Sequence, residues 1–310
     1  MEHRRLGRTG LHLSALGLGT MTWGSDTDEH EAKDLLTEFL DVGGSLLDTA
    51  PGYGQGGAED LIGELIGKVV DRRDVILMTK GGVSVDRSGK VRLDASRRTL
   101  IDSLDDSLQR LGTSTVDLFL VQAPDPYTEL DEVAGALEHI VASGRAHYVG
   151  LSNFAAWQVG YLAGALSTPL ALVQSEYSLV HRAAEDELLP ACQALGAGFI
   201  GWAGLGRGVL TGKYRHTVPA DSRAATAHLA AYVEPYLSQR YSGIIEAVAT
   251  AAQGLDVPPL QVAAAWAQAH EAVSSILVGP RTAAQLRPLL AGDFELPNQI
   301  REALSEASEL

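Results

Sequence analysis

Four polar side chains that could act on a substrate follow apolar stretches of the sequence. Asp48 ends an apolar Leu-Leu run, and the Pro/Gly turn after it presents Tyr53. Two later apolar runs end in the same way, one at Lys80 and one at Gln122. In a parallel α/β barrel the catalytic groups lie at the carboxyl ends of the strands, which share one face. We therefore expect Asp48, Tyr53, Lys80 and Gln122 to converge on a catalytic face.

The recurrence of strand-like runs indicates the scaffold that would position these groups. Apolar runs alternate with amphipathic stretches of helical period, as in right-handed parallel crossovers. Eight such units favour an α/β fold of the (β/α)8 TIM-barrel type, and a doubly wound open sheet is the rival architecture. We predict one barrel domain over residues 1–310. The eight runs are 15–19, 45–48, 75–78, 116–121, 147–151, 171–175, 198–202 and 275–279.

Further segments complete the predicted domain. A small β-hairpin at residues 3–13 is expected to plug the bottom of the barrel. Residues 81–92 and 214–242 are longer than βα connections need to be, and the second shows no regular pattern. Long loops at the carboxyl face usually shape the substrate pocket. Apolar helical faces are predicted within 35–42, 100–111, 133–141 and 300–310.

Composition restricts the class of protein. The 310 residues are 45% hydrophobic and 20% charged with 33 glycines, which is typical of a soluble α/β enzyme. The formal charge of −15 argues against nucleic acid as a general partner, because phosphate backbones are met by a surplus of Lys and Arg. A single cysteine, Cys192, allows no disulfide within the chain. No signal peptide and no apolar run of roughly 18 residues is present, so we expect a cytoplasmic protein without a membrane segment.

Six motifs, in order and at matching spacing, resemble those of the aldo-keto reductases over nearly the whole chain. The resemblance implies a (β/α)8 barrel that reduces the carbonyl group of a small molecule with NADP(H). The motifs are Asp48-Thr-Ala-Pro-Gly-Tyr-Gly54, Met78-Thr-Lys80, Asp117-Leu-Phe-Leu-Val121, Gly150-Leu-Ser-Asn-Phe154, Gly206-Arg-Gly-Val-Leu-Thr-Gly-Lys213 and Gly279-Pro-Arg-Thr282.

The resemblance assigns roles to the three groups of the first motifs. Tyr53 would be the proton donor, Lys80 its tuner and Asp48 the partner that holds the lysine. Hydride arriving at a carbonyl carbon leaves charge on the oxygen, which must be protonated or held by donors. A phenol with a pKa of about 10 is a poor acid at neutral pH, and a neighbouring ammonium favours its ionised form.

Gln122 departs from the family pattern. Most relatives carry a histidine there, which contacts the substrate oxygen. A glutamine amide can donate a hydrogen bond but cannot titrate, so substrate orientation could survive while a proton relay could not. Three outcomes stay open: slower ketone reduction, a shift to conjugated enones, or loss of catalysis in a redox-sensing, cofactor-binding subunit. Ketone or aldehyde reduction is the leading hypothesis.

The resemblance also implies a cofactor site. Ser152, Asn153 and Gln174 match the residues that hydrogen-bond the nicotinamide carboxamide, and Trp202 matches the aromatic ring on which nicotinamide stacks. Other matches lie after the seventh and eighth strands, where glycines permit close approach to a pyrophosphate and a helix start suits the 2′-phosphate. These matches are Leu205, Gly206, Gly208, Lys213, Gly279, Arg281, Thr282 and Gln285.

Four positions in these two loops differ from the family. Ala203 and Gly204 replace a serine and a proline, so one side-chain phosphate contact is lost. Pro288 and Leu289 replace a Glu-Asn pair that contacts adenine, which puts adenine affinity in doubt.

The remaining candidates are aromatic. Trp23, after the first strand, and Tyr127, after the fourth, are expected to line the substrate pocket. Tyr232, Tyr236 and Tyr241 suggest a lid over the site or a subunit contact in a homo-oligomer. The histidines lack ligand spacing, so no metal site is expected.

Overall fold

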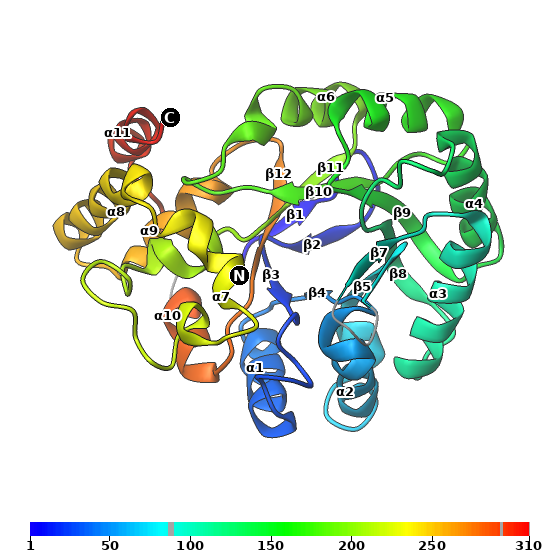
Figure 1. Cartoon of the computed structure of the whole chain (residues 1–310), viewed down its shortest axis with the longest axis horizontal. Helices are drawn as coiled ribbons and strands as arrows, with labels where there is room; N and C mark the ends of the chain where they lie inside the picture. Colours follow the sequence, from blue (N-terminus) through cyan, green and yellow to red (C-terminus); the bar gives the residue numbers. More distant parts are fainter. Residues whose placement is uncertain (86–89, 292–293, 310) are drawn as a thin grey trace.

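Eight short parallel strands hydrogen-bond in a closed ring, as the sequence predicts (Figure 1). The computed structural model describes residues 1–85, 90–291 and 294–309. Around the ring the order is β10-β11-β12-β3-β4-β5-β8-β9, so chain neighbours lie side by side. The strands are β3 (Leu16–Gly19), β4 (Leu46–Asp48), β5 (Ile76–Gly81), β8 (Val116–Val121), β9 (Ala146–Ser152), β10 (Leu172–Glu176), β11 (Gly198–Trp202) and β12 (Val273–Val278).

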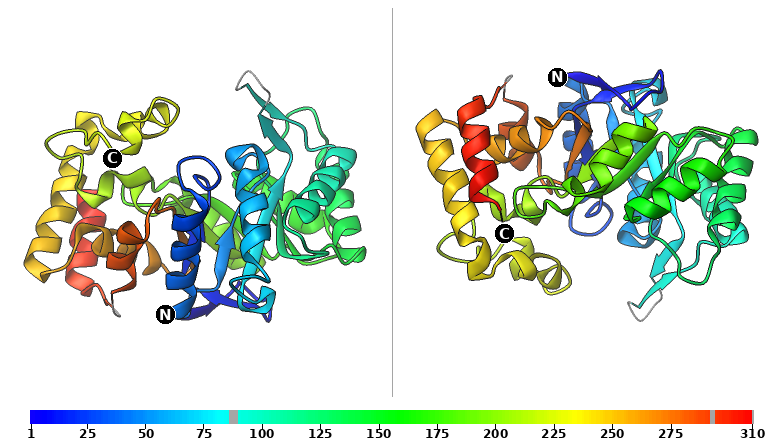
Figure 2. Two further views of the ribbon diagram at one scale, coloured as in Figure 1. Left: turned by 90° about the horizontal axis from the view of Figure 1, so that it is seen from below. Right: turned by 90° about the horizontal axis from the view of Figure 1, so that it is seen from above.

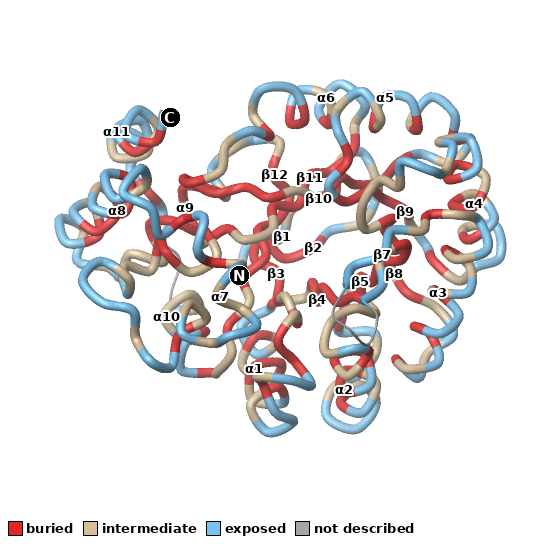
Figure 3. Tube along the Cα trace, in the orientation of Figure 1, coloured by how far each residue is buried: buried red, intermediate tan, exposed pale blue. Residues whose placement is uncertain are grey.

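Helices surround this ring and turn their buried faces toward it (Figures 1 and 3). Among the described residues, no helix combines the length and apolar character that a membrane span needs. The helices are α1 (Glu29–Asp41), α2 (Gly57–Leu65), α3 (Arg97–Arg110), α4 (Leu130–Ala142), α5 (Ala156–Ala165), α6 (Leu188–Leu195), α8 (Ser242–Leu255), α9 (Pro259–Gln268), α10 (Ala283–Leu290) and α11 (Asn298–Ala307), with the 3-10 turns η1 (Tyr53–Gly56), η2 (Arg72–Asp74), η3 (Ala183–Glu185) and η4 (Gly206–Thr211).

Helix α3 shows how local sequence sets these elements. Ser96 caps its first turn by accepting a hydrogen bond from the backbone N–H of Thr99. Leu100, Leu104 and Leu108 recur at four-residue steps and are buried against the barrel. The predicted helical faces at 35–42, 133–141 and 300–310 likewise fall in α1, α4 and α11; Leu310 lies outside the described residues.

The predicted N-terminal plug is present. Strands β1 (His3–Arg5) and β2 (His12–Ser14) pair antiparallel. They lie at the end of the barrel opposite the segment 214–242 (Figure 2). Leu6 and Leu13 are fully buried and pack with the barrel interior, including Leu46 and Leu118. The plug therefore closes the amino ends of the strands and leaves the carboxyl ends for a site.

Both long connections contain more structure than the sequence indicated. Strands β6 (Val83–Val85) and β7 (Val91–Leu93) form a hairpin within the predicted loop 81–92, whose residues 86–89 lie outside the described chain. The expectation of no regular structure over 214–242 was wrong. Tertiary contacts stabilise short helical turns there that have no hydrophobic period of their own. They are η5 (Arg223–Ala225), α7 (Ala230–Val233), η6 (Glu234–Tyr236) and η7 (Gln239–Tyr241).

Candidate active site

A cavity of about 530 Å³ opens at the carboxyl ends of the barrel strands. It brings together all four predicted catalytic residues and most of the predicted cofactor residues. Those on its wall are Asp48, Tyr53, Lys80, Gln122, Ser152, Asn153, Gln174, Trp202, Leu205, Gly208, Lys213, Gly279, Arg281 and Gln285.

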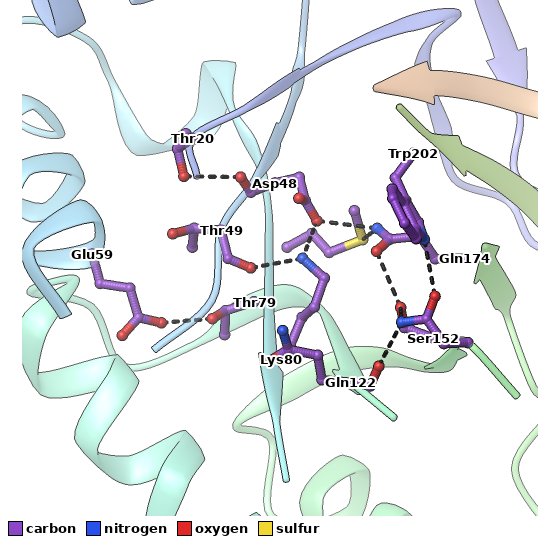
Figure 4. Close-up of polar contacts among 12 residues, drawn as sticks. Thr20, Asp48, Thr49, Glu59, Thr79, Lys80, Gln122, Ser152, Gln174 and Trp202 are labelled. Carbon is purple, nitrogen blue, oxygen red and sulfur yellow. Dashed lines mark hydrogen bonds and ion pairs between the residues drawn. The ribbon is translucent and has the colours of Figure 1, made fainter. Parts of the chain in front are cut away.

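Three of these residues form a buried cluster of proton-carrying groups (Figure 4 labels Asp48 and Lys80). Asp48 ends β4 and is paired in register with Met78 of β5. Lys80 lies two residues further along β5, on the same face, and its long side chain reaches Asp48. Lys80 Nζ donates to Asp48 Oδ1 and, at 2.9 Å, to the carbonyl oxygen of Thr49. It lies 5.2 Å from the ring centroid of Tyr53. The third N–H of the ammonium remains for the Tyr53 phenol.

The turn η1 delivers Tyr53 to this cluster. Gly54 adopts a left-handed φ of +57°, and a Cβ there would lie 2.8 Å from the carbonyl oxygen of Trp23. Only glycine fits such a backbone conformation at such close approach. The turn is therefore pinned against the loop that contains Trp23, which fixes the direction of the Tyr53 ring.

The protonation of the cluster follows from burial and charge. Burial raises the pKa of Tyr53, the Lys80 ammonium lowers it, and the net pKa lies above its ordinary value. Burial lowers the pKa of Lys80, but Asp48 and Tyr53 outweigh this and the net pKa is raised. At neutral pH the phenol and the ammonium both carry their protons. The site thus holds a loaded proton donor.

Gln122 lies beside this cluster at the end of β8. Its backbone carbonyl accepts a hydrogen bond of 2.9 Å from Asn153 Nδ2. Its side-chain oxygen is buried and has no hydrogen-bond partner within the described chain. The amide therefore has hydrogen-bonding capacity that the protein does not use.

A chain of hydrogen bonds connects the predicted carboxamide-binding residues (Figure 4 labels three of them). Trp202 Nε1 donates to Asn153 Oδ1 at 3.0 Å. Asn153 Nδ2 lies 3.0 Å from Ser152 Oγ, and Ser152 Oγ donates to Gln174 Oε1 at 3.3 Å. Asn153 has a left-handed φ of +64°, which asparagine tolerates better than most residues. The bonds fix the four side chains on one wall of the cavity.

The other end of the cavity is positively charged. Lys213, Arg223 and Arg281 line it, and in the described chain none of the three forms an ion pair with a carboxylate. Burial, and to a smaller extent the nearby Arg281, lower the pKa of Arg223. The Arg223 guanidinium donates to the carbonyl oxygen of Gly279, and that of Arg281 donates to the carbonyl oxygen of Asp221. Cations that form no ion pair have the charge and the donors that phosphate groups require.

Arg223 was missed by the sequence analysis. It lies in the segment 214–242, which has no period that would predict where its side chains point. The same segment is tied to the barrel by Arg207, whose guanidinium pairs with Glu176 at 2.8 and 2.6 Å and donates to the carbonyl oxygen of Tyr232 at 2.8 Å. Glu176 therefore holds the segment against the cavity through Arg207.

The three tyrosines of this segment divide by location. Tyr232 lines the cavity. Tyr236 is buried, and its hydroxyl lies 3.0 Å from both Glu176 Oε1 and His181 Nδ1. Tyr241 packs edge-on against Tyr236, with the ring centroids 5.1 Å apart. Of the predicted lid, Tyr232 alone reaches the site.

Four predicted site residues lie off the cavity wall. The prediction that Trp23 and Tyr127 line it was wrong: Trp23 is fully buried beneath the Tyr53 turn, and Tyr127 is 95% exposed on the loop after β8. Gly206 is buried behind the loop, and the Thr282 hydroxyl caps α10 by accepting from the backbone N–H of Gln285. Apolar character cannot distinguish a residue that supports a loop from one that faces a cavity.

Comparison with known proteins agrees with this geometry. A model of the Aldo/keto reductase family matches residues 15–309. The chain belongs to the aldo/keto reductase family. The uncharacterized oxidoreductase YrpG of Bacillus subtilis (strain 168) is 34% identical over 319 aligned residues, which cover 99% of this chain and 95% of that protein. A probable voltage-gated potassium channel subunit beta of Oryza sativa subsp. japonica is 34% identical, over 90% of this chain and 87% of its own.

A solved structure supports the same fold. The glycerol dehydrogenase of Gluconobacter oxydans matches with a TM-score of 0.83 and 24% identity, over 98% of this chain and 94% of that one. At that identity the likeness establishes the fold alone. As an aldo/keto reductase, the protein is an oxidoreductase that uses a nicotinamide cofactor.

Proposed function

We propose that the protein is an NADPH-dependent reductase of aldehydes or ketones, with Tyr53 as the general acid. The observation that carries this proposal is the buried cluster of Asp48, Lys80 and Tyr53 on the wall of a cavity whose other end is cationic. A nicotinamide cofactor bound along this cavity would supply the hydride. The phenol then gives its proton to the carbonyl oxygen as charge develops there.

The neighbouring residues support this step. The Lys80 ammonium stabilises the phenolate that remains, and Asp48 holds the ammonium in place. Gln122 orients the substrate by donating from its side-chain amide to the same carbonyl oxygen. Because the pKa of Tyr53 and that of Lys80 are both raised, Tyr53 is protonated before the reaction begins.

The cavity residues fit an NADP(H) molecule. Ser152, Asn153 and Gln174 offer amide and hydroxyl groups to the carboxamide, and Trp202 offers an indole face. The cations Lys213, Arg223 and Arg281, together with the backbone near Leu205, Gly206 and Gly208, would hold the phosphates. Gly279, Thr282 and Gln285 surround the start of α10, where a 2′-phosphate would lie beside Arg281. The cations at this end of the cavity favour NADPH over NADH, which lacks that phosphate.

Enone reduction or redox sensing on the same scaffold is the alternative function. The Gln122 side-chain oxygen, which accepts no hydrogen bond within the described chain, lies where most relatives carry a titrating histidine, and this favours a non-standard substrate. The similarity to a probable channel subunit beta adds a regulatory, cofactor-binding role to the alternatives.

A binding titration followed by turnover assays tests the proposal. The purified protein is titrated with NADPH and NADH, and the tighter complex is mixed with aldehydes, ketones and enones while nicotinamide absorbance is followed. We expect tighter NADPH binding and oxidation by a carbonyl compound. Oxidation by enones alone would move the assignment to double-bond reduction. Tight binding without turnover on any class would favour the sensor.

A further inference from the structure

The buried cluster of Asp48, Lys80 and Tyr53 is joined by a fourth side chain, Gln174, on the side where the cofactor residues lie. Asp48 Oδ1 accepts two hydrogen bonds, one from Lys80 Nζ and one of 3.1 Å from Gln174 Nε2 (Figure 4). All three side chains are almost completely buried, at 4%, 1% and 2% exposure. Bulk solvent therefore competes little with either donor at this oxygen.

The other end of the Gln174 amide faces the cofactor residues. Its Oε1 accepts from Ser152 Oγ at 3.3 Å, and Ser152 Oγ also contacts Asn153 Nδ2 at 3.0 Å. Asn153 in turn accepts from Trp202 Nε1. One planar amide thus bridges the acid cluster and the wall on which the nicotinamide would lie.

We propose that Gln174 is a positioning residue for Tyr53. Gln174 and Lys80 both donate to Asp48 Oδ1, and through this oxygen Gln174 couples the hydrogen bonds of the cofactor-side wall to the pKa of Tyr53. This inference rests on the proposed function, because it takes Tyr53 as the acid. Its content is separate: it concerns the bond between Gln174 and Asp48 rather than any contact to the cofactor.

The direction of the coupling follows from the charges. An N–H donor on a carboxylate oxygen disperses part of its negative charge. Without the Gln174 donor, Asp48 attracts the Lys80 proton more strongly and repels a phenolate at Tyr53 more strongly. Both changes make Tyr53 hold its proton more tightly. A ligand amide that competes for Gln174 acts in the same direction as loss of the donor.

Few other charges complicate this argument. The titratable or charged groups that face Tyr53 are Lys80 from β5, Asp48 from β4 and Tyr232 from α7. Glu59 of the adjacent helix α2 is paired with an arginine of α3 at 2.7 Å. Removing the Gln174 amide therefore changes no charge. It deletes the hydrogen bond to Asp48, together with the bond from Ser152 Oγ and a contact of 3.9 Å to Met78 Sδ, and of these three the first alone reaches the ion pair.

A titration of the cofactor-free protein tests the inference without catalysis. 3,5-Difluorotyrosine, whose phenol is more acidic than that of tyrosine, is placed at position 53 and its ¹⁹F shift is followed against pH. In Gln174→Met we expect the midpoint to rise by about 0.5 to 1 pH unit. Ser275→Ala is the matched control, because Ser275 is a buried polar residue of β12 away from the cavity wall. Its midpoint should equal that of the wild type.

The outcomes separate this inference from the proposed function. An unchanged midpoint in Gln174→Met overturns the inference and leaves Tyr53 as the acid. Full carbonyl turnover in Tyr53→Phe overturns the proposed function itself. If Gln174→Met does not fold, Gln174→Asn keeps an amide that is one methylene too short to reach Asp48, and the same rise is expected.

Discussion

Replacing Lys80 with methionine removes one half of a buried ion pair and leaves an unbranched apolar side chain that is one atom shorter. The Lys80 and Asp48 side chains are 2% and 5% exposed, so solvent screens neither charge. Asp48 would be left with the Gln174 amide as its donor. Breaking a buried pair from one side costs about 3 to 5 kcal/mol, because the remaining charge is uncompensated. We expect Lys80→Met to lower the free energy of unfolding by about this amount at pH 7.

A double variant separates the charge from the packing. Lys80→Met combined with Asp48→Asn removes the orphan charge, so it should cost less than Lys80→Met alone, with a coupling of about 1 to 3 kcal/mol. Arg98→Met is the exposed control, since Arg98 and Asp102 are 90% and 61% exposed, and it should change stability by less than about 0.5 kcal/mol. Urea unfolding measures the wild type, Lys80→Met, Asp48→Asn, the double variant and Arg98→Met. A cost below about 1 kcal/mol for Lys80→Met, or strict additivity in the double variant, would refute the reasoning.

The raised pKa of Lys80 also fixes the pH at which the pair stabilises the fold. When the pKa of a group is higher in the folded than in the unfolded protein, the group stabilises the fold fully at any pH below its unfolded pKa, which is about 10.4 for lysine. The contribution is lost as the pH rises through the folded pKa. The difference between wild type and Lys80→Met should therefore stay constant from pH 7 to about 9 and shrink in alkali.

Three further predictions concern ligand binding and turnover. Arg223→Met should weaken NADPH binding by about tenfold or more in a fluorescence titration, because it removes a charge-assisted contact. Arg287→Met is the control and should leave NADPH binding unchanged, because Arg287 pairs with Glu38 on the outer face of α10. Equal effects of the two variants would contradict the assignment. Gln122→Leu should lower kcat for carbonyl reduction by about 10² by deleting a donor to the developing oxyanion, and unaltered kcat would remove Gln122 from the mechanism. Because the pKa of Tyr53 is raised, carbonyl reduction should be flat through neutral pH and fall on the alkaline side; a rate that rises with pH would exclude the phenol as acid.

Much of the fold could be predicted from the sequence. The eight barrel strands are short, apolar and separated by helical periods. Seven were found within two residues of their predicted bounds, and β5 extends three residues past its predicted end, to Gly81. Asp48, Lys80 and Gln122 could be grouped without contact information, because parallel strands bring their carboxyl ends to one face. The spacing of apolar residues was sufficient to predict the segments whose structure is determined by burial alone.

Other features depend on contacts that no local pattern encodes. Trp23 and Tyr127 both follow strands, yet one supports a turn and the other faces solvent. Arg223 donates to the carbonyl oxygen of Gly279, which lies in a different part of the chain. The bond between Gln174 and Asp48 spans 126 residues and exists only after the barrel closes.

The phenol of Tyr53 is the centre of the account, and its removal is the most direct test. Tyr53→Phe keeps the ring in the η1 turn and deletes the proton. With NADPH and a carbonyl substrate that the wild type accepts, turnover should fall by about 10² to 10⁴, while NADPH affinity measured by fluorescence stays within about twofold. Turnover near that of the wild type, with the same NADPH affinity, would contradict the assignment of Tyr53 as the acid.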